Sequence, residues 1–504
     1  MKILATKISS ALAVLSFCLV PGSAAQDCAS LPKLVSANTT ITSASLIPAA
    51  GALPEYCRVQ GRVDAEIGFE VRLPTTWNGK FYFQGAPGFV GFIAAPGPGL
   101  MRGYAEATTD TGHQGGPGDA SWALNNPERQ VNFGNRAVHS VTIAAKQIVQ
   151  AFYGRMPEQS YFEGCSNGGR QALMEAQRYP TDFNGIIAGS PGLDYTGLMM
   201  SWIWDAEALK LAPNLASKVP MIAAAVLEEC DARDGLRDGL ISDPRRCRFN
   251  PRILQCAGGD GSNCLTLDEV RTLLKIHGGV VNSDQEQIFP GLSYGHEDGA
   301  DGWSRWVTGS GTTPSVDFGT VDGYLRSFIF GPDFDTMTFN FESDPARVVP
   351  TGDFLNATNP DLSLFKANGG KLLLWNGWAD PVATPARAVR YFLDVVDTLG
   401  DDTLQFSRLF MAPGVHHCGG GAGPNTFDML GPLESWVEHG TAPDRIIASH
   451  LTGNAVDRTR PLCAYPREAR YMAAAASMTP RISFAVDPWM TKTGIDLRAS
   501  ATLR

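Results

Sequence analysis

A glycine-rich turn between a strand-like run and a helix-forming run constrains this chain more than any other feature. The turn reads Gly164-Cys165-Ser166-Asn167-Gly168-Gly169, after the strand-like run 161–163 and before helix formers at 170–178. G-x-S-x-G in this setting is typical of a nucleophile elbow, in which a serine on a sharp strand-to-helix turn exposes its hydroxyl at the sheet edge. Glycines leave room where the strand and the helix converge.

The rest of the pattern alternates apolar strands with helices. We expect strands at 81–83, 103–110, 183–189, 370–375 and 407–411, and helices at 135–153, 385–396 and 431–439. Such alternation predicts an α/β fold with a parallel sheet and right-handed crossovers. By contrast, residues 28–74 are predicted to be loop-rich with short strands such as 70–73, and the tail beyond Arg460 to be mostly irregular.

One long stretch interrupts this alternation. Residues 193–357 are rich in tryptophan, cysteine and loops, and we expect them to form a large inserted lid domain. The hydrolase-like core would then consist of residues 26–192 and 358–504.

The first 25 residues are typical of an export signal. Lys2 and Lys7 precede an apolar run, and small residues end it at 23–25. The run is too short for a membrane anchor. We therefore expect a secreted or periplasmic protein with no membrane attachment after signal removal.

The charge of the chain argues against polyanionic partners. The formal net charge is -10 and the sequence pI is about 5.4. Neither nucleic acid nor an anionic membrane surface attracts such a protein. The sequence does not indicate an oligomeric state.

A serine nucleophile needs a base and an acid, and two later loops contain them. Asp380 follows the expected strand that ends at residue 375, and two adjacent histidines, His416 and His417, follow the strand that ends at 411. The order Ser, Asp, His is that of α/β-hydrolases. Upstream, the glycine-rich loop 85–91 offers Gly88 as an oxyanion donor because Pro87 has no N–H, although an ordinary turn is the alternative.

The cysteines bear on the choice between the two histidines. Cys165 precedes Ser166 and Cys418 follows His417. A disulfide between them would bring serine and base together, because bonded cysteines have Cα atoms about 6 Å apart. That pairing favours His417, and a buried Cys165 thiol is the alternative.

Other cysteines suggest local crosslinks in an oxidising compartment. Of ten cysteines, Cys18 lies in the export signal, which leaves an odd number. Cys28 with Cys57, and Cys256 with Cys264, are candidate pairs.

An acidic loop in the expected lid is a candidate metal site. Asp231, Asp234 and Asp238 lie close together in the sequence, and Gly235 and Gly239 allow the backbone to turn so that carbonyl groups join them. Hard oxygen ligands on a flexible loop suit Ca²⁺. A solvated acidic turn is the alternative.

Taken together, these motifs resemble the tannase and feruloyl esterase family, with support from the segments 103–113 and 460–466. The resemblance implies an α/β-hydrolase fold with a lid, a triad of Ser166, Asp380 and His417, and oxyanion donors at Gly88 and Asn167. It implies a structural calcium ion bound by the three aspartates and by the carbonyls of Leu236 and Leu240. It also implies a Cys230–Cys247 disulfide. The family partner of Cys463 lies further toward the C-terminus, and no cysteine follows it here, so we expect a free thiol.

The resemblance also bounds the substrate. Trp303 and Trp306 are the candidate pocket residues, and a place in the lid core is the alternative for each. The related mono-terephthalate ester hydrolase uses a lid arginine, and residues 315–324 contain none, which disfavours that activity. A small phenolic ester is expected, feruloyl esters before galloyl esters. A catalytically inactive, calcium-stabilised binding protein is the alternative outside enzymes.

Overall fold

The structure, a computed structural model, describes residues 27–34, 36, 38–472 and 483–486. The expected export signal, 1–25, lies outside the described residues. Within these ranges, no helix combines the length and the apolar character that crossing a bilayer requires.

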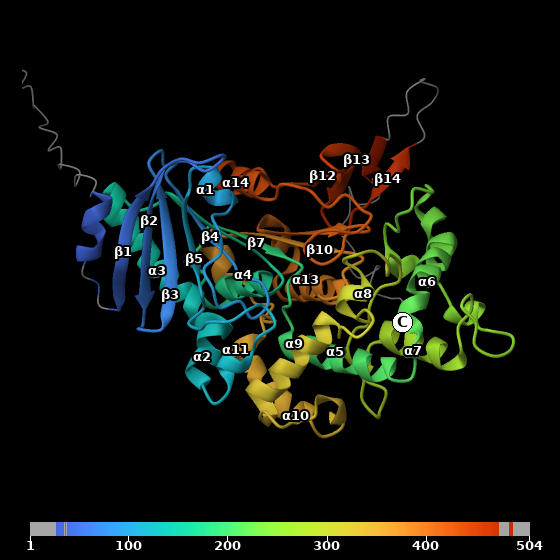
Figure 1. Cartoon of the computed structure of the whole chain (residues 1–504). Helices are drawn as coiled ribbons and strands as arrows, with labels where there is room; N and C mark the ends of the chain where they lie inside the picture. Colours follow the sequence, from blue (N-terminus) through green and yellow to red (C-terminus); the bar gives the residue numbers. More distant parts are fainter. Residues whose placement is uncertain (1–26, 35, 37, 473–482, 487–504) are drawn as a thin grey trace, which may run out of the picture.

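A nine-stranded sheet forms the centre of the molecule, in the order β1-β2-β3-β5-β4-β6-β7-β10-β11 (Figure 1). From β5 to β11 neighbouring strands are parallel, whereas β1, β2, β3 and β5 pair antiparallel. The predicted α/β class is confirmed. The strand bounds are β1 Thr39–Ile47, β2 Tyr56–Val63, β3 Ile67–Pro74, β4 Lys80–Gln84, β5 Ala105–Thr109, β6 Gln159–Cys165, β7 Gly185–Gly189, β10 Lys371–Gly377 and β11 Ser407–Ala412.

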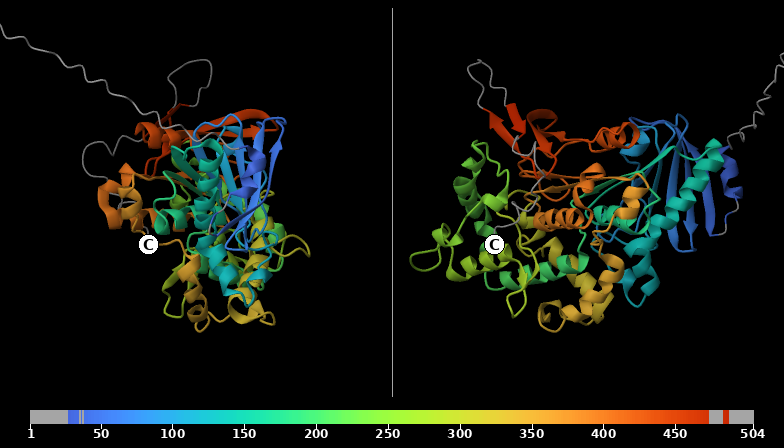
Figure 2. Two further views of the ribbon diagram at one scale, coloured as in Figure 1. Left: turned by 90° about the vertical axis from the view of Figure 1, so that its left-hand side faces the viewer. Right: turned by 180° about the vertical axis from the view of Figure 1, so that it is seen from behind.

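Helices cover both faces of the parallel part of the sheet (Figures 1 and 2). Alternate strand residues point to opposite faces, so Phe81 and Phe83 pack with one layer and Tyr82 with the other. The first layer contains α3 Ala137–Tyr153, α4 Asn167–Arg178 and α13 Pro385–Leu399. The second layer contains α14 Leu430–His439.

Two segments contain more strand than predicted, and the predicted short strand 70–73 is part of β3. Residues 39–74 contain three long strands, because their charged side chains are neutralised inside the sheet: buried Arg72 pairs with Glu70 at 2.7 Å and with Glu106 at 2.6 Å. Every residue of β3 is buried, Glu70 and Arg72 included, and these charges made the segment read as polar and loop-rich in the sequence. Before the tail, β12 Arg445–Thr452 forms a hairpin with β13 Ala455–Cys463. Beyond Arg460, where mostly irregular structure is expected, β14 Ala469–Met472 pairs with β15 Ser483–Val486, and residues 473–482 and 487–504 lie outside the described residues.

A long insertion separates β7 from β10, although the two strands are direct neighbours, with Leu373 opposite Ile187. It packs beside the carboxyl-end loops of the sheet and is drawn from green to orange in Figure 1. We call residues 193–357 the lid. One apolar cluster lies wholly within it, and a second joins lid residues to core residues such as Phe89, Trp122 and Phe133. Its elements are α5 Tyr195–Leu209, α6 Leu215–Cys230, α7 Leu267–Gly278, β8 Val280–Val281, β9 Gln287–Phe289, α8 Trp303–Trp306, α9 Val316–Tyr324, α10 Pro345–Val348 and α11 Gly352–Leu355.

Candidate active site

Ser166 lies on the turn between β6 and α4, in the strained backbone conformation of an elbow. Its φ is 63° and its ψ is -123°. The turn closes only because its neighbours lack side chains: a Cβ at Gly164 would lie 2.4 Å from the carbonyl oxygen of Gly168. Strain of this kind persists where packing over-determines the backbone, and it is found at functional sites.

Asp380 and His417 form a buried pair on the loops that follow β10 and β11. His417 Nδ1 lies 3.1 Å from Asp380 Oδ1 and 3.0 Å from Oδ2. The backbone N–H groups of Val382 and Ala383 both donate to Asp380 Oδ1 at 2.9 Å. A carboxylate fixed in this way keeps the Nδ1 proton on His417, and the other ring nitrogen, Nε2, is free to accept a proton.

A disulfide joins the serine turn to the histidine loop. Cys165 and Cys418 are bonded, with Cα atoms 5.9 Å apart across 253 residues of sequence. The positive φ of Cys418, 60°, shows how sharply the chain turns beside His417. Ser166 and His417, both described residues, share no hydrogen bond in this structure. Such contacts are often long in an enzyme without substrate and tighten when substrate binds.

The second histidine, His416, faces the lid. Its Nε2 lies 2.8 Å from the carbonyl oxygen of His296, and the ring is buried. A carbonyl accepts, so His416 donates from Nε2. Of the two adjacent rings, only that of His417 contacts Asp380.

The loop 85–91, which we call the oxyanion loop, presents one unused donor. The N–H groups of Gly85, Ala86, Phe89, Val90 and Gly91 all donate to partners within the protein. Pro87 has no N–H, so in this fully described loop only the Gly88 N–H remains without a partner. Asn167 is the first residue of α4, where helix N–H groups have no intrahelical acceptor. Asn167 follows Ser166 directly in the chain, and the loop that contains Gly88 contacts α4 at Ala86. The assignment of the two N–H groups as oxyanion donors stays a prediction.

Comparisons with known proteins settle the family. A model for tannase and feruloyl esterase matches residues 51–483, which is most of the chain. This chain belongs to the tannase and feruloyl esterase family. It is therefore a carboxylic ester hydrolase, as the Ser, Asp and His arrangement predicts.

Three relatives illustrate the match. The esterase is 37% identical to an uncharacterized esterase of Xanthomonas campestris, over 94% of each chain. It is 33% identical to mono(2-hydroxyethyl) terephthalate hydrolase of Piscinibacter sakaiensis, over 84% of this chain and 83% of the relative. The crystal structure of feruloyl esterase B from Aspergillus oryzae superposes with a TM-score of 0.81 at 25% identity and covers 89% of this chain and 97% of that one. The last match confirms the α/β-hydrolase fold.

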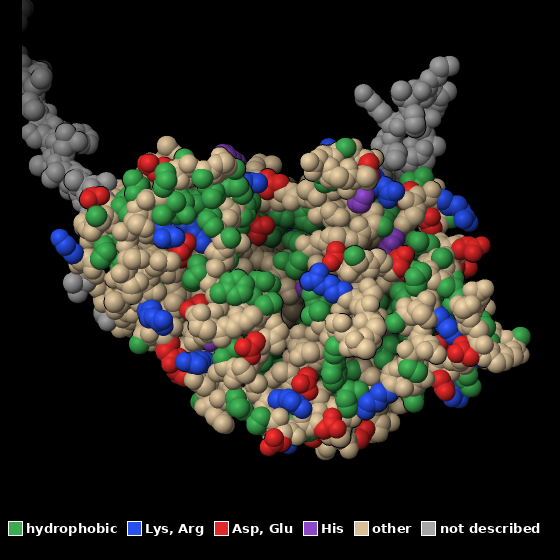
Figure 3. Space-filling model, in the orientation of Figure 1, with side chains coloured by type: hydrophobic (Ala, Val, Ile, Leu, Met, Phe, Trp, Pro, Cys, Tyr) green, Lys and Arg blue, Asp and Glu red, His purple; other side chains and the backbone are tan. Residues whose placement is uncertain are grey.

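The two lid tryptophans of this esterase lie in different surroundings. Trp306 reaches the site: its ring stands edge-on to His417, with centroids 5.3 Å apart and planes at 76°. Its indole N–H is buried without a partner among the described residues. Trp303 is 3% exposed and packs inside the lid, 5.3 Å from the ring of His277. The face of the molecule drawn in Figure 3 has a hollow near its middle.

The cysteines pair as the sequence and the resemblance suggest. Besides the bridge at the serine, the structure forms the disulfides Cys28–Cys57, Cys230–Cys247 and Cys256–Cys264. Cys463 is the free cysteine of the described residues and is buried. Burial raises the pKa of this thiol, which makes it a poor nucleophile.

One residue that supports the Asp380 loop was not predicted from the sequence. Asn376, at the end of β10, is fully buried, and its amide donates to the Ala383 carbonyl at 3.0 Å and to Asp380 Oδ2 at 3.4 Å. It thereby orients the turn that presents Asp380. The signal for it was an amide side chain directly after an uninterrupted apolar strand.

Proposed function

We propose that this esterase hydrolyses esters of phenolic acids through an acyl-enzyme on Ser166, with feruloyl and other hydroxycinnamoyl esters favoured. The observation that carries the proposal is the indole of Trp306, which reaches from the lid to the ring of His417. An aromatic wall beside the base supports binding of an aromatic acyl group, since ring pairs add about 0.5–1.5 kcal/mol beyond area burial.

The chemistry follows from the residue positions. His417 Nε2 takes the proton of the Ser166 hydroxyl, whose oxygen attacks the ester carbonyl. The N–H groups of Gly88 and Asn167 would stabilise the negative oxygen of the tetrahedral intermediate. The alcohol leaves with the proton from His417. Water then gives a proton to His417 and attacks the acyl-enzyme, which releases the acid while the proton returns to Ser166.

Two related activities compete with this proposal. Galloyl esters differ from feruloyl esters in their ring hydroxyls and lack the propenoyl spacer, so a shallower pocket would favour them. Terephthalate monoesters carry a free carboxylate, and residues 315–324 provide no arginine for it. The alternative outside enzymes, an inactive binding protein, is disfavoured by the Asp380–His417 pair.

The test is a substrate panel of methyl ferulate, methyl gallate and mono(2-hydroxyethyl) terephthalate, with Ser166→Ala as the inactive control. We expect the highest kcat/KM with methyl ferulate and loss of turnover in the control. A preference for methyl gallate would assign galloyl esters instead. Failure of folded protein to hydrolyse any ester and to react with a serine-directed phosphonate would favour the binding protein.

We also propose that the acidic loop of the lid binds Ca²⁺. The donor set is hard oxygen throughout, and Gly235 and Gly239 adopt φ of 92° and 78°, which curls the loop inward. Asp231 accepts from the Gly239 N–H at 3.0 Å. In the described structure, the carboxylate oxygens of Asp231, Asp234 and Asp238 do not all come within 4.8 Å of one another. In the proposed site, the carbonyls of Leu236 and Leu240, which the family resemblance implies, would complete the ligand set. The bound ion would stabilise the lid.

Export from the cytoplasm is the remaining proposal. The support is four disulfides, which persist in oxidising compartments. The N-terminal sequence of the mature protein would test it, and a chain that begins at Gln26 is expected.

A further inference from the structure

The oxyanion loop is held from both sides by buried side chains that bind its backbone. On one side lies α4, which begins directly after Ser166. On the other side lies the segment 111–117, which follows β5. The unused Gly88 N–H lies between the two points of attachment.

On the side of α4, two side chains bind both polar groups of one residue. Gln171 Oε1 accepts from the Ala86 N–H at 3.0 Å, and Asn167 Nδ2 donates to the Ala86 carbonyl at 3.1 Å. Gln171 and Asn167 are 3% and 5% exposed. The pair of hydrogen bonds fixes both the position and the orientation of the backbone two residues before Gly88.

The Asn167 amide is itself oriented by Arg170. The guanidinium Nε donates to Asn167 Oδ1 at 2.7 Å. The remaining guanidinium donors bind carbonyls, with Nη1 at 2.6 Å from Gly134 O and Nη2 at 3.1 Å from Phe133 O. Because only oxygen can accept from Nε, this contact fixes which end of the Asn167 amide faces Ala86.

On the opposite side, His113 holds Phe89. His113 Nε2 lies 2.8 Å from the Phe89 carbonyl oxygen, and Nδ1 lies 3.2 Å from the Thr111 hydroxyl. A carbonyl only accepts, so the proton is on Nε2 and Nδ1 accepts from the hydroxyl. The ring stacks on Trp122 with centroids 3.8 Å apart.

Glycine makes this approach possible. A Cβ at Gly91 would lie 2.4 Å from His113 Cδ2. At Gly85, a Cβ would lie 2.9 Å from the Cα of Gly168. The loop therefore lacks side chains where its two supports press against it.

We infer that Asn167, Gln171 and His113 are positioning residues, whose side chains hold the oxyanion loop so that the Gly88 N–H points at the developing oxyanion. The inference rests on the proposed acyl transfer at Ser166. An oxyanion donor works through its preorganised direction, and removal of one donor costs about 10²–10³ in kcat. Loosening a donor is a smaller change than removing it, so the loss is expected near the lower part of that range or below it.

The test compares leucine and glutamate at position 171. Gln171→Leu removes the oxygen that accepts from the Ala86 N–H, whereas Gln171→Glu keeps an acceptor oxygen. The Gln171 amide nitrogen has no partner within the described chain, so its replacement by oxygen in glutamate breaks no hydrogen bond. For Gln171→Leu we expect kcat with methyl ferulate to fall about tenfold at nearly unchanged KM, and Gln171→Glu to recover most of it. His113→Phe, which keeps the stacking on Trp122 and loses the donor, is expected to lower kcat similarly, with His113→Gln recovering part.

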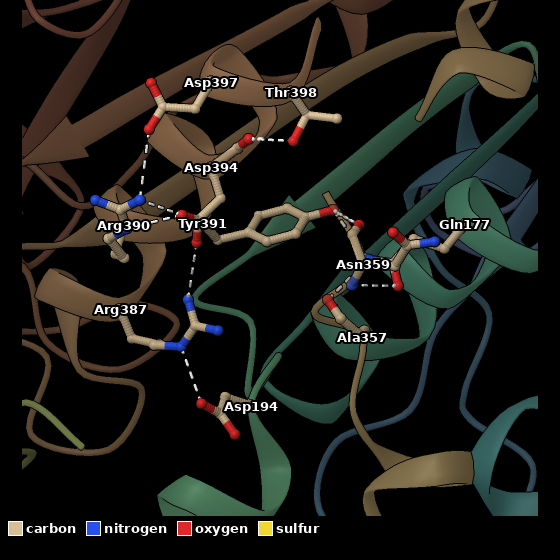
Figure 4. Close-up of polar contacts among 10 residues, drawn as sticks. All are labelled: Gln177, Asp194, Ala357, Asn359, Arg387, Arg390, Tyr391, Asp394, Asp397 and Thr398. Carbon is tan, nitrogen blue, oxygen red and sulfur yellow. Dashed lines mark hydrogen bonds and ion pairs between the residues drawn. The ribbon is translucent and has the colours of Figure 1, made fainter. Parts of the chain in front are cut away.

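A matched control lies on the same helix. Gln177 is also a part-buried glutamine of α4, but it donates to the Ala357 carbonyl at 2.7 Å and to the Tyr391 hydroxyl at 2.9 Å (Figure 4). These bonds fasten the far end of α4 to the segment after α11 and to α13. Gln177→Leu is expected to lower Tm and to leave kcat unchanged.

Inhibitor binding separates positioning from general loosening. A trifluoromethyl ketone analogue of the ester adds Ser166 and acquires an oxyanion, whereas free ferulate does not. In Gln171→Leu and His113→Phe, the Ki of the ketone should rise about as much as kcat falls, and the Ki of ferulate should stay constant. Folded variants that keep kcat, or that lose kcat without weaker ketone binding, would overturn the positioning role alone. Turnover by Ser166→Ala would instead overturn the proposed acyl transfer.

Discussion

At the scale of single residues, Asp380 shows how a side chain can be changed without disturbing its surroundings. Its Oδ1 accepts two backbone N–H groups, and an asparagine oxygen would accept them equally well. An asparagine amide facing His417 Nδ1 would instead favour the wrong tautomer of the imidazole. Asp380→Asn is therefore expected to lower kcat by about 10⁴ while Tm falls little, as measured by ester hydrolysis and thermal unfolding.

Asp394→Asn is the control for this change. Asp394 lies on α13, the helix that follows the Asp380 loop, and pairs with Arg390 and Arg387 (Figure 4). The kcat of the Asp394→Asn variant should equal that of the natural enzyme. A loss of less than about tenfold in Asp380→Asn would mean that another group orients His417, since a single hydrogen bond near 1.4 kcal/mol would account for it.

Local motifs allowed the sequence to predict part of the site. The turn at Ser166 is encoded by residues that are adjacent in the chain, and the cysteine beside His417 distinguished it from His416. The supports of the oxyanion loop could not be predicted in the same way, because Gln171 meets Ala86 across 85 residues. Likewise, which of Trp303 and Trp306 faces His417 depends on how α8 is rotated, and that is set by packing.

At the scale of elements, α4 contains a buried acid that links stability to pH. Glu175 is 1% exposed and forms a close group with Asp182 and His139 of α3. Burial, and then the nearby Asp182 carboxylate, raise the pKa of Glu175 well above its usual value, against the smaller effect of Lys146. His139 Nδ1 lies 2.6 Å from Asp182 Oδ2, and a buried carboxyl such as that of Glu175 favours its neutral form.

The direction of the pH effect follows from that shift. Above about pH 4.5 the unfolded chain gives up the Glu175 proton, whereas the folded chain retains it up to the raised pKa. The unfolded state then binds fewer protons, so the free energy of unfolding falls as pH rises through this window, by at most about 1.4 kcal/mol per pH unit for one proton. In Glu175→Gln this contribution is absent. Urea unfolding between pH 5 and 8 should therefore give a shallower decline for the variant than for the natural enzyme, and parallel curves would contradict the assignment.

Also at the scale of elements, the proposed Ca²⁺ site in the acidic loop predicts that the ion stabilises the folded protein. If Ca²⁺ binds folded protein only, it stabilises by RT ln(1 + [Ca²⁺]/Kd), about 2.7 kcal/mol at 100 times Kd. Chelation by EGTA should therefore lower Tm by several degrees, and excess Ca²⁺ should restore it. Asp231→Asn with Asp234→Asn should abolish the difference. Asp268→Asn, which changes an exposed aspartate of α7, should retain it. An identical Tm with and without Ca²⁺ in the natural enzyme would exclude the site.

At the scale of the whole molecule, the alternation of strands and helices predicted the parallel half of the sheet, whereas for the antiparallel half the sequence predicted only short strands such as 70–73. The parallel strands β4, β6, β7 and β10 read as apolar runs, because helices cover both of their faces. In β3 the sequence alternates apolar residues with Glu70 and Arg72, whose ion pairs form only after folding. The full length of such a strand is set by its partners, which lie elsewhere in the chain.

The bridge between Cys165 and Cys418 ties the two halves of this molecule together, and its removal should affect stability and catalysis at once. Closing a loop of 253 residues in the unfolded chain is worth about 5 kcal/mol on the chain-entropy account. The variant with serine at both positions should therefore unfold at lower urea and should also lose kcat, because His417 loses its anchor to the turn of Ser166. Serine at Cys28 and Cys57 is the control, since that bridge spans 29 residues far from the triad and should cost stability alone. If the Cys165 and Cys418 variant, assayed where it is folded, kept its full kcat, the bridge would serve stability only, and the packing of the lid against His416 would have to hold the base in place.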